Sequence, residues 1–204
     1  MARPSGSSVR FSLVRAATAL ALATLALAGC AGQATNDTFT LSAMPAVEGR
    51  AAKGRQLLVP EPSALKALDS EQIVVRLSGA ELQYLAQSQW SDRLPRMVQS
   101  KLVQAFEASG RLGGVGKPGE GLAIDYQLLT DIRAFEVSTA GPQRAIVEIS
   151  AKLLNDRNGT IVAQKAFRAE IPVAGSGNKA FVAGLDKAFA TVAAQIVSWS
   201  LGVI

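Results

Sequence analysis

The 204-residue chain has no histidine and a single cysteine, Cys30. A lone cysteine cannot close a disulfide within the chain, and one thiol without histidine makes a poor metal site. The missing histidine also removes the usual general base for serine and cysteine nucleophiles. The commonest hydrolase designs are therefore excluded, although carboxylates and lysines remain as catalytic candidates.

The N-terminal region lacks acidic residues. No acid precedes Asp37, and the first 29 residues contain three arginines. Residues 16–28 are apolar except for two threonines. A positive region followed by a short apolar stretch is typical of a secretory signal peptide, because a spanning helix needs about 20 apolar residues. We expect no later stretch to be long and apolar enough to cross a bilayer.

The end of this apolar stretch reads Leu27-Ala28-Gly29-Cys30 and resembles the bacterial lipobox. In a lipobox, a diacylglycerol is attached to the cysteine sulfur and the chain is cut before the cysteine. The alternative is an ordinary signal peptide with a chance cysteine, but the position, flanks and motif favour the lipobox. We therefore predict that Cys30 is the lipidation site, and that two or more acyl chains anchor it stably.

These features predict three segments. Residues 1–29 form the signal peptide, 30–38 the lipidated cysteine with a flexible tether, and 39–204 one folded domain. Without the signal peptide the chain has 18 basic and 16 acidic residues, a formal charge of +2. The basic residues are scattered and aromatic residues are few, so we expect no nucleic-acid binding.

Hydrophobic periodicity predicts the main elements of the domain. We expect helices over 92–109 and from about residue 178, the first with Ser91 as its N-cap and Gly110 just beyond its end. Loops are expected at 49–55 and 113–121, and a hairpin turn at 155–159. Strands are expected at 39–41, 56–59, 72–77, 81–86, 122–137, 145–153 and 160–173.

The predicted order is ββ-α-βββ-α. The fold class is therefore α/β in the broad sense, more narrowly α+β. We expect a single two-layer domain with a mainly antiparallel sheet and two principal helices packed on one face, since both helices carry an apolar stripe that must be covered.

Residues that could carry chemistry are few. The glycine-rich loop does not fit a phosphate-binding P-loop, because Gly116-Lys117 is followed by Pro118 and then by an expected strand. Four carboxylates are the remaining catalytic candidates, and each is better explained as a helix-start or strand-surface residue: Glu81, Asp92, Asp125 and Asp131. We expect neither enzymatic activity nor a bound metal or cofactor.

Two aromatic residues stand just before the first expected helix. Tyr84 and Trp90 either pack in the core, which is the default for large aromatic side chains, or help to form a surface for a partner or lipid. The sequence leaves both alternatives open.

The stretch 70–110 closely resembles the ABC-type transport auxiliary lipoprotein family, which includes the paraquat-inducible protein C type. The resemblance lies in Gln72-Ile73-Val74-Val75-Arg76, Leu82-Gln83-Tyr84, Trp90 with Leu94-Pro95, and the helix end at 102–110. None of these motifs is catalytic. The resemblance implies a non-enzymatic accessory of an ABC transporter and an MCE (mammalian cell entry) domain protein that move phospholipids or other hydrophobic molecules. Any partner contact would involve Tyr84, Trp90 or Arg93, although Arg93 lies where the sequence departs from the family.

The residue after the cysteine is Ala31 and not aspartate. In enteric bacteria an aspartate at this position favours retention in the inner membrane, so Ala31 favours the outer membrane. The expected location is therefore the outer membrane, facing the periplasm. A lipoprotein that activates a cell-wall synthase is the alternative function, and a carboxylate-dependent hydrolase is a third. A ring-shaped MCE partner would suit a homo-oligomer, and the sequence leaves the oligomeric state open.

Overall fold

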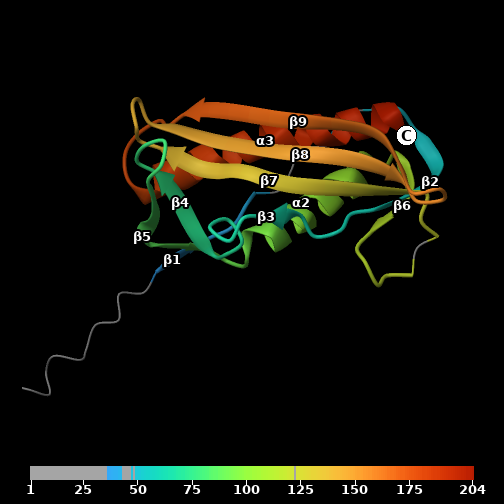
Figure 1. Cartoon of the computed structure of the whole chain (residues 1–204), viewed down its shortest axis with the longest axis horizontal. Coiled ribbons are helices and arrows are strands. Elements are labelled where there is room, and N and C mark those ends of the chain that lie inside the picture. The colour runs from blue at the N-terminus through green and yellow to red at the C-terminus, as the bar shows by residue number, and fades with distance from the viewer. Residues whose placement is uncertain (1–35, 43–46, 48, 122) are drawn as a thin grey trace, which may run out of the picture. The chain divides into compact units, whose positions relative to one another are not determined.

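The computed structural model describes residues 36–42, 47, 49–121 and 123–204. The predicted signal peptide, Cys30 and the predicted tether as far as residue 35 lie outside the described residues. The elements follow one another (Figure 1) in the order β1 (Asp37–Phe39), β2 (Ala52–Leu58), β3 (Ser63–Ala64), β4 (Gln72–Arg76), β5 (Leu82–Trp90), α2 (Leu94–Ser109), β6 (Leu112–Gly116), β7 (Tyr126–Ser138), β8 (Arg144–Asn155), β9 (Thr160–Pro172) and α3 (Asn178–Val203).

The sheet is organised around β7. On one side, β8 pairs antiparallel along nearly the whole of β7, and β9 pairs with β8 in the same way. On the other side, β2, β3 and β4 pair with β7 one after another, all in parallel. From there β2 continues to β6, and β4 continues to β5 and β1. The long ladders are antiparallel, which confirms the mainly antiparallel sheet, whereas the short parallel pairs were not predicted.

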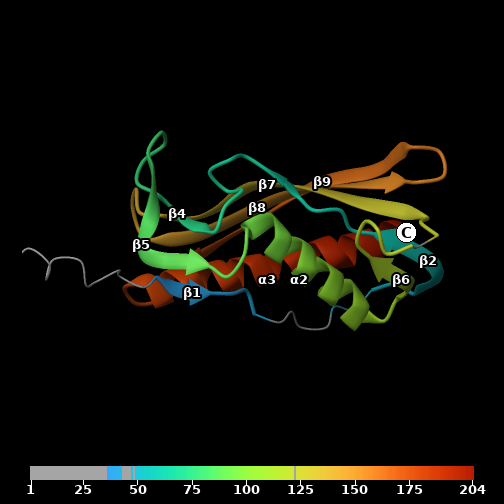
Figure 2. The ribbon, with the colours of Figure 1, turned by 90° about the horizontal axis from the view of Figure 1, so that it is seen from below.

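Both helices lie on the same face of this sheet (Figure 2). α3 packs against β7, β8 and β9, and α2 packs against α3 and β6. The opposite face carries no helix among the described residues. The predicted two-layer α+β domain with two helices on one face is therefore confirmed.

The core fills the space between the helices and the sheet. Alternate residues of β8 from Ala145 to Leu153 are fully buried, as the sequence alternation predicts, and meet the apolar stripe of α3. Burying a large aliphatic side chain such as Val147, Ile149 or Leu153 stabilises the folded state by roughly 1.5–3 kcal/mol. Trp90, Phe135 and Phe189 form an aromatic chain through this layer, with ring centroids 5.7 and 5.9 Å apart.

α3 contradicts the expectation that no later stretch is long and apolar enough to cross a membrane. By length and composition alone it qualifies, with a mean hydropathy of 1.4 over its most apolar window. Half of that window is buried inside the fold. The reason for its apolar character is that one long helix covers three strands, so that a wide stripe of its surface meets the sheet.

The start of α2 also differs from the prediction. Ser91 is not the N-cap: the helix begins at Leu94 with Arg93 at the N-cap position and no side-chain cap. The amide of Leu94 instead donates to the carbonyl of Ser70, 3.0 Å away. The chain reaching α2 is thus held by a neighbouring loop, which replaces a local cap. The predicted C-terminal glycine is confirmed, because Gly110 adopts the left-handed conformation with φ 58°.

Two predicted loops are partly strand. The second half of the expected loop 49–55 belongs to β2, which begins at Ala52. The first half of the expected loop 113–121 belongs to β6, which pairs in parallel with β2. Gly113 is needed there for close approach, because an added Cβ would lie 2.3 Å from the backbone oxygen of Lys53. At the other end of the domain, Asp37 and Thr38 were assigned to the flexible tether, but they pair with Ser88 and Gln89 of β5. The described domain therefore begins earlier than predicted.

The close approach at β6 gives a first testable prediction. Gly113→Ala should destabilise the domain by about 1–3 kcal/mol, because the new methyl group forces the β2 and β6 backbones apart. The measurement is the free energy of urea unfolding. Gly54→Ala on β2 is the matched control, because nothing lies within 4 Å of its added Cβ, and it should be neutral or stabilising by up to about 1 kcal/mol. Equal effects of the two changes would contradict the assigned backbone contact.

Candidate functional site

The helix-free face of the sheet exposes large apolar side chains at the β4–β5 end. Leu65, Leu82 and Tyr84 are 77%, 41% and 46% exposed. Leu82 and Tyr84 are two residues apart on β5 and pair with Arg76 and Val74 of β4, so both point to the same face. We call Leu65, Leu82 and Tyr84 the β4–β5 patch.

Leu65 reaches the patch from the segment between β3 and β4. This segment folds over the outer surface of β4, and its Leu68 covers Val74, which is 1% exposed. Leu65 and Leu82 both line a small depression of about 60 Å³. A cavity of that size is far below the roughly 300–1,000 Å³ of small-molecule sites, so the patch is suited to contact with another surface.

An ion pair forms the base of the patch. Arg76 of β4 binds both carboxylate oxygens of Glu136 on β7, with Nη2 2.8 Å from Oε2, and Glu136 is only 5% exposed. The hydrogen bond to Glu136 raises the pKa of Arg76. Arg76 also donates to the carbonyl of Gly79, in the β4–β5 turn. A bidentate pair fixes orientation as well as distance, so β4 and its hairpin are held rigidly on β7.

The strand β5 changes its role along its length. Its pairing with β4 is interrupted by a bulge, where Gln87 adopts a positive φ of 55°. The side chain of Asn178, at the start of α3, donates to the carbonyl of Ala86 and to the Ser88 hydroxyl at 2.9 and 2.7 Å. After the bulge β5 pairs with β1. Before the bulge, among the described residues, its outer edge has no neighbouring strand.

The structure separates the three residues predicted for partner contact. Tyr84 is exposed in the patch, whereas Trp90 is 1% exposed and packs edge-on against Phe135, so it is a core residue. Arg93 binds Asp69 in the β3–β4 segment and Glu61 just before β3, which holds both segments against the start of α2. The hydrogen bond to Asp69 is the main cause of its raised pKa. Arg93 therefore supports the patch from a distance, and Cys30 lies outside the described residues.

Leu65 is the patch residue that sequence reasoning missed. It lies in an irregular segment with no hydrophobic period, and the two-residue strand β3 is too short to give one. No local signal distinguishes this leucine from a core residue. Leu82 and Tyr84 both lie on the strand expected at 81–86, and their pairing with Arg76 and Val74 places them on one face.

The candidate catalytic carboxylates do not form a paired site. The Asp92 carboxylate accepts a hydrogen bond from the backbone amide of Arg93 and pairs with Arg96. The Asp131 carboxylate accepts a hydrogen bond from the Ser63 hydroxyl at 2.8 Å. The Glu81 carbonyl closes the β4–β5 turn with Leu77. In the described part of the chain no group of three or more acidic or thiol side chains could hold a metal ion.

The Asp125 carboxylate connects parts of the sheet that are distant in sequence. Its carboxylate accepts from the Gln56 amide at 3.0 Å and from Arg157 in the β8–β9 turn at 2.6 Å, and Arg55 lies 3.5 Å away. The Gln56 hydrogen bond, assisted by Arg157, lowers the pKa of Asp125 despite burial, which acts in the opposite direction. The carboxylate is thus held ionised by structural partners and is poorly suited to donating a proton.

The hydrogen bonds to the Asp125 carboxylate predict that the stability of the domain depends on pH. Because the folded pKa is below the unfolded value of 3.8, the stabilisation is present above that value and is lost as the pH falls through the folded pKa. Asp125→Asn should have a lower free energy of unfolding than the unchanged chain at pH 7. The difference between the two free energies should become smaller as the pH falls below about 4. Urea unfolding of both proteins at several pH values measures this difference in free energy. Asp156→Asn, in the exposed β8–β9 turn, is the control. A gap independent of pH would contradict the assignment.

Comparisons with known proteins agree with the fold described above. The family model described as ABC-type transport auxiliary lipoprotein component matches residues 39–197. The uncharacterized protein bll6063 of Bradyrhizobium diazoefficiens is 32% identical over 161 residues, which cover 75% of this chain and 42% of the relative. The chain thus spans less than half the length of that curated relative.

Solved structures show the same architecture. The crystal structure of protein XCC0632 from Xanthomonas campestris, assigned to DUF330, is 30% identical with a TM-score of 0.76, covering 81% of this chain and 94% of that one. The hypothetical protein CT253 from Chlamydia trachomatis has a TM-score of 0.51 at 9% identity, covering 73% and 97% of the two chains. At that identity the second likeness concerns the fold alone.

Proposed function

Because the chain belongs to the family of ABC-type transport auxiliary lipoprotein components, we propose that it is the lipid-anchored accessory of a system pairing an ABC transporter with an MCE-domain protein. The system would move phospholipids or other hydrophobic molecules across the cell envelope. The accessory acts by anchoring and docking and catalyses no reaction. The observation that carries the docking role is the exposed β4–β5 patch on an otherwise helix-free face.

The anchoring half of the proposal rests on Cys30 and on where the domain begins. Lipid on Cys30 would fix the chain to the membrane, and β1 begins at Asp37. Seven residues span at most about 25 Å when fully extended. The domain is therefore kept close to its membrane, which we assign to the outer membrane with the domain facing the periplasm because Ala31 follows the cysteine.

The docking half rests on the chemistry of the β4–β5 patch. Tyr84 offers a large apolar surface with a polar hydroxyl, a combination that is enriched among residues dominating binding energy. Leu65 and Leu82 flank it, and the Arg76–Glu136 pair keeps the surface preformed, which lowers the entropy cost of binding. The MCE-domain protein is the partner we assign to this patch.

The alternative function, activation of a cell-wall synthase, requires a reach across the peptidoglycan. A long disordered tether would supply it. The described domain begins at Asp37, so the segment available after Cys30 is shorter than the sequence suggested. This geometry favours docking near the membrane over the synthase role.

Photo-crosslinking in cells tests the docking surface. A photoreactive amino acid replacing Tyr84 or Leu65 should capture an MCE-domain protein, because both side chains project from the patch. The same probe replacing Gln164, exposed on β9 outside the patch, is the matched control and should not capture it. Mass spectrometry identifies the partner. Capture of a cell-wall synthase at Tyr84 would favour the alternative, and equal capture from Gln164 would refute the patch.

Substitution of the cysteine tests the anchor. Cys30→Ser should abolish membrane attachment while leaving the fold intact, because every described core residue lies at or beyond Leu41. Membrane fractionation measures attachment, and far-UV circular dichroism of the released protein measures folding. Ala31→Ser, which keeps the cysteine, is the control and should remain attached. Continued membrane attachment of Cys30→Ser would show that the lipobox assignment is wrong.

A further inference from the structure

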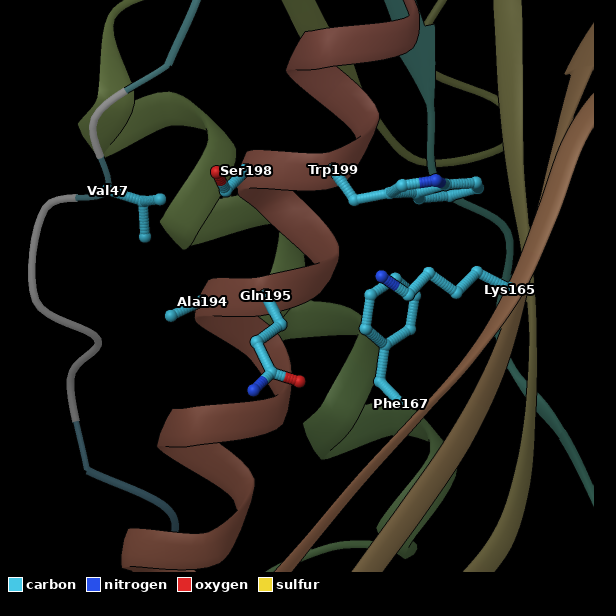
Figure 3. Close-up of a pocket in the computed structure, with 7 residues that line it drawn as sticks. All are labelled: Val47, Lys165, Phe167, Ala194, Gln195, Ser198 and Trp199. Carbon is cyan, nitrogen blue, oxygen red and sulfur yellow. The ribbon is translucent and has the colours of Figure 1, made fainter.

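A second surface feature lies far along the chain from the β4–β5 patch. A groove of about 570 Å³ runs over the exposed side of α3, between β9 and Val47. Figure 3 shows Lys165 and Phe167 projecting from β9 toward Trp199, while Gln195 and Ser198 lie on the outer surface of α3. This volume falls within the roughly 300–1,000 Å³ of small-molecule sites. We call it the α3–β9 groove.

The apolar wall of the groove is preformed. Phe167 is 3% exposed, and Trp199 packs against it edge-to-face with ring centroids 5.6 Å apart at 64°. Trp199 itself remains partly exposed, as do Ala194 and Val47. An aliphatic chain lying across these three side chains would remove apolar surface from water without requiring the core to move.

The groove has a single cation at its edge. The Lys165 ammonium lies 5.3 Å from the centre of the Phe167 ring and makes no ion pair within the described residues. The neighbouring acids Glu148 and Glu170 are bound by Arg168 on the opposite face of the sheet. Lys165 is therefore available to an anion, and an ammonium held over apolar surface favours a ligand with one charged end.

We propose that the α3–β9 groove binds a fatty acid, with its carboxylate on Lys165 and its aliphatic chain against Trp199, Ala194 and Val47. A carboxylate fits better than a phosphate monoester, because one lysine and no arginine lines the groove and a doubly charged head calls for several donors. Gln195 and Ser198 offer neutral hydrogen bonds to the same head group. This inference goes beyond the docking role and does not require the MCE partner.

A contrasting pocket supports the choice of site. The depression beside the start of α2 is lined by Arg96, Lys101 and Lys117 with serine and threonine, and has no aromatic side chain. It offers charge without an apolar wall, so an aliphatic chain gains little there. Among the pockets described, only the α3–β9 groove joins an aromatic wall to one unpaired cation.

Photo-labelling of the full-length lipidated protein in nanodiscs of fixed composition tests the proposal. The probe is palmitate with a diazirine in its chain, and mass spectrometry locates the adducts. The expected adducts fall on the last turns of α3, around Trp199. Lys165→Gln should reduce their yield about fivefold or more, and Lys165→Arg should retain it. Ala194→Trp, which fills the groove, should reduce it as well.

The controls distinguish the groove from the bilayer background. Lys152→Gln removes an exposed lysine from the opposite face of β8 and should leave the yield unchanged. A diazirine probe of the same chain length with a trimethylammonium head should label the groove at least fivefold less. Equal yields in Lys165→Gln and Lys152→Gln, adducts spread over the whole chain, or equal labelling by the cationic probe would overturn the proposal. Stronger labelling by a lysophosphatidate probe would overturn the carboxylate assignment.

Discussion

The structure depends on the pairing of β7 on both of its sides. β8 fixes one side along its length, and three short parallel strands share the other. A register shift between Ile132 and Ala134 keeps Phe135 facing the helices, because a shift of one residue reverses the faces of every residue that follows it. The same shift turns Glu136 to the open face, where it holds Arg76. One irregularity in β7 thus positions both the aromatic core and the base of the β4–β5 patch.

The one-sided covering of the sheet places the core on one face and the β4–β5 patch on the other. The helix face contains the aromatic chain and the apolar stripe of α3, which belong to one hydrophobic core. On the open face, the long strands carry alternating charges, including the Arg133–Glu148–Arg168 network, which keeps that part of the sheet soluble. Exposed large apolar side chains therefore stand out at the β4–β5 end, and Ile161 and Val162 are also exposed at the start of β9.

The sequence correctly predicted the features that depend on residues close together along the chain. The alternation in β8, the 155–159 turn and the glycine ending α2 were predictable, because each rests on neighbouring residues. The cap of α2, the strand β6 and the parallel pairs depend on backbone groups distant in sequence, such as the Ser70 carbonyl. Tyr84 was predicted as a surface candidate together with Trp90, and only burial separates the two. Leu65 and the α3–β9 groove required the tertiary structure.

The separation of Tyr84 from Trp90 within a single strand has a physical cause in the bulge of β5. In a regular strand Tyr84 and Trp90 would lie on the same face, because their positions differ by an even number of residues and side chains alternate with a period of two. The positive φ of Gln87 and the hydrogen bonds from Asn178 break the strand into a surface half and a core half. Among the described residues, the surface half has an unpaired outer edge and exposed apolar side chains, while the core half pairs with β1. The exposed half and the paired half of β5 therefore meet at the bulge, which Asn178 at the start of α3 holds in place.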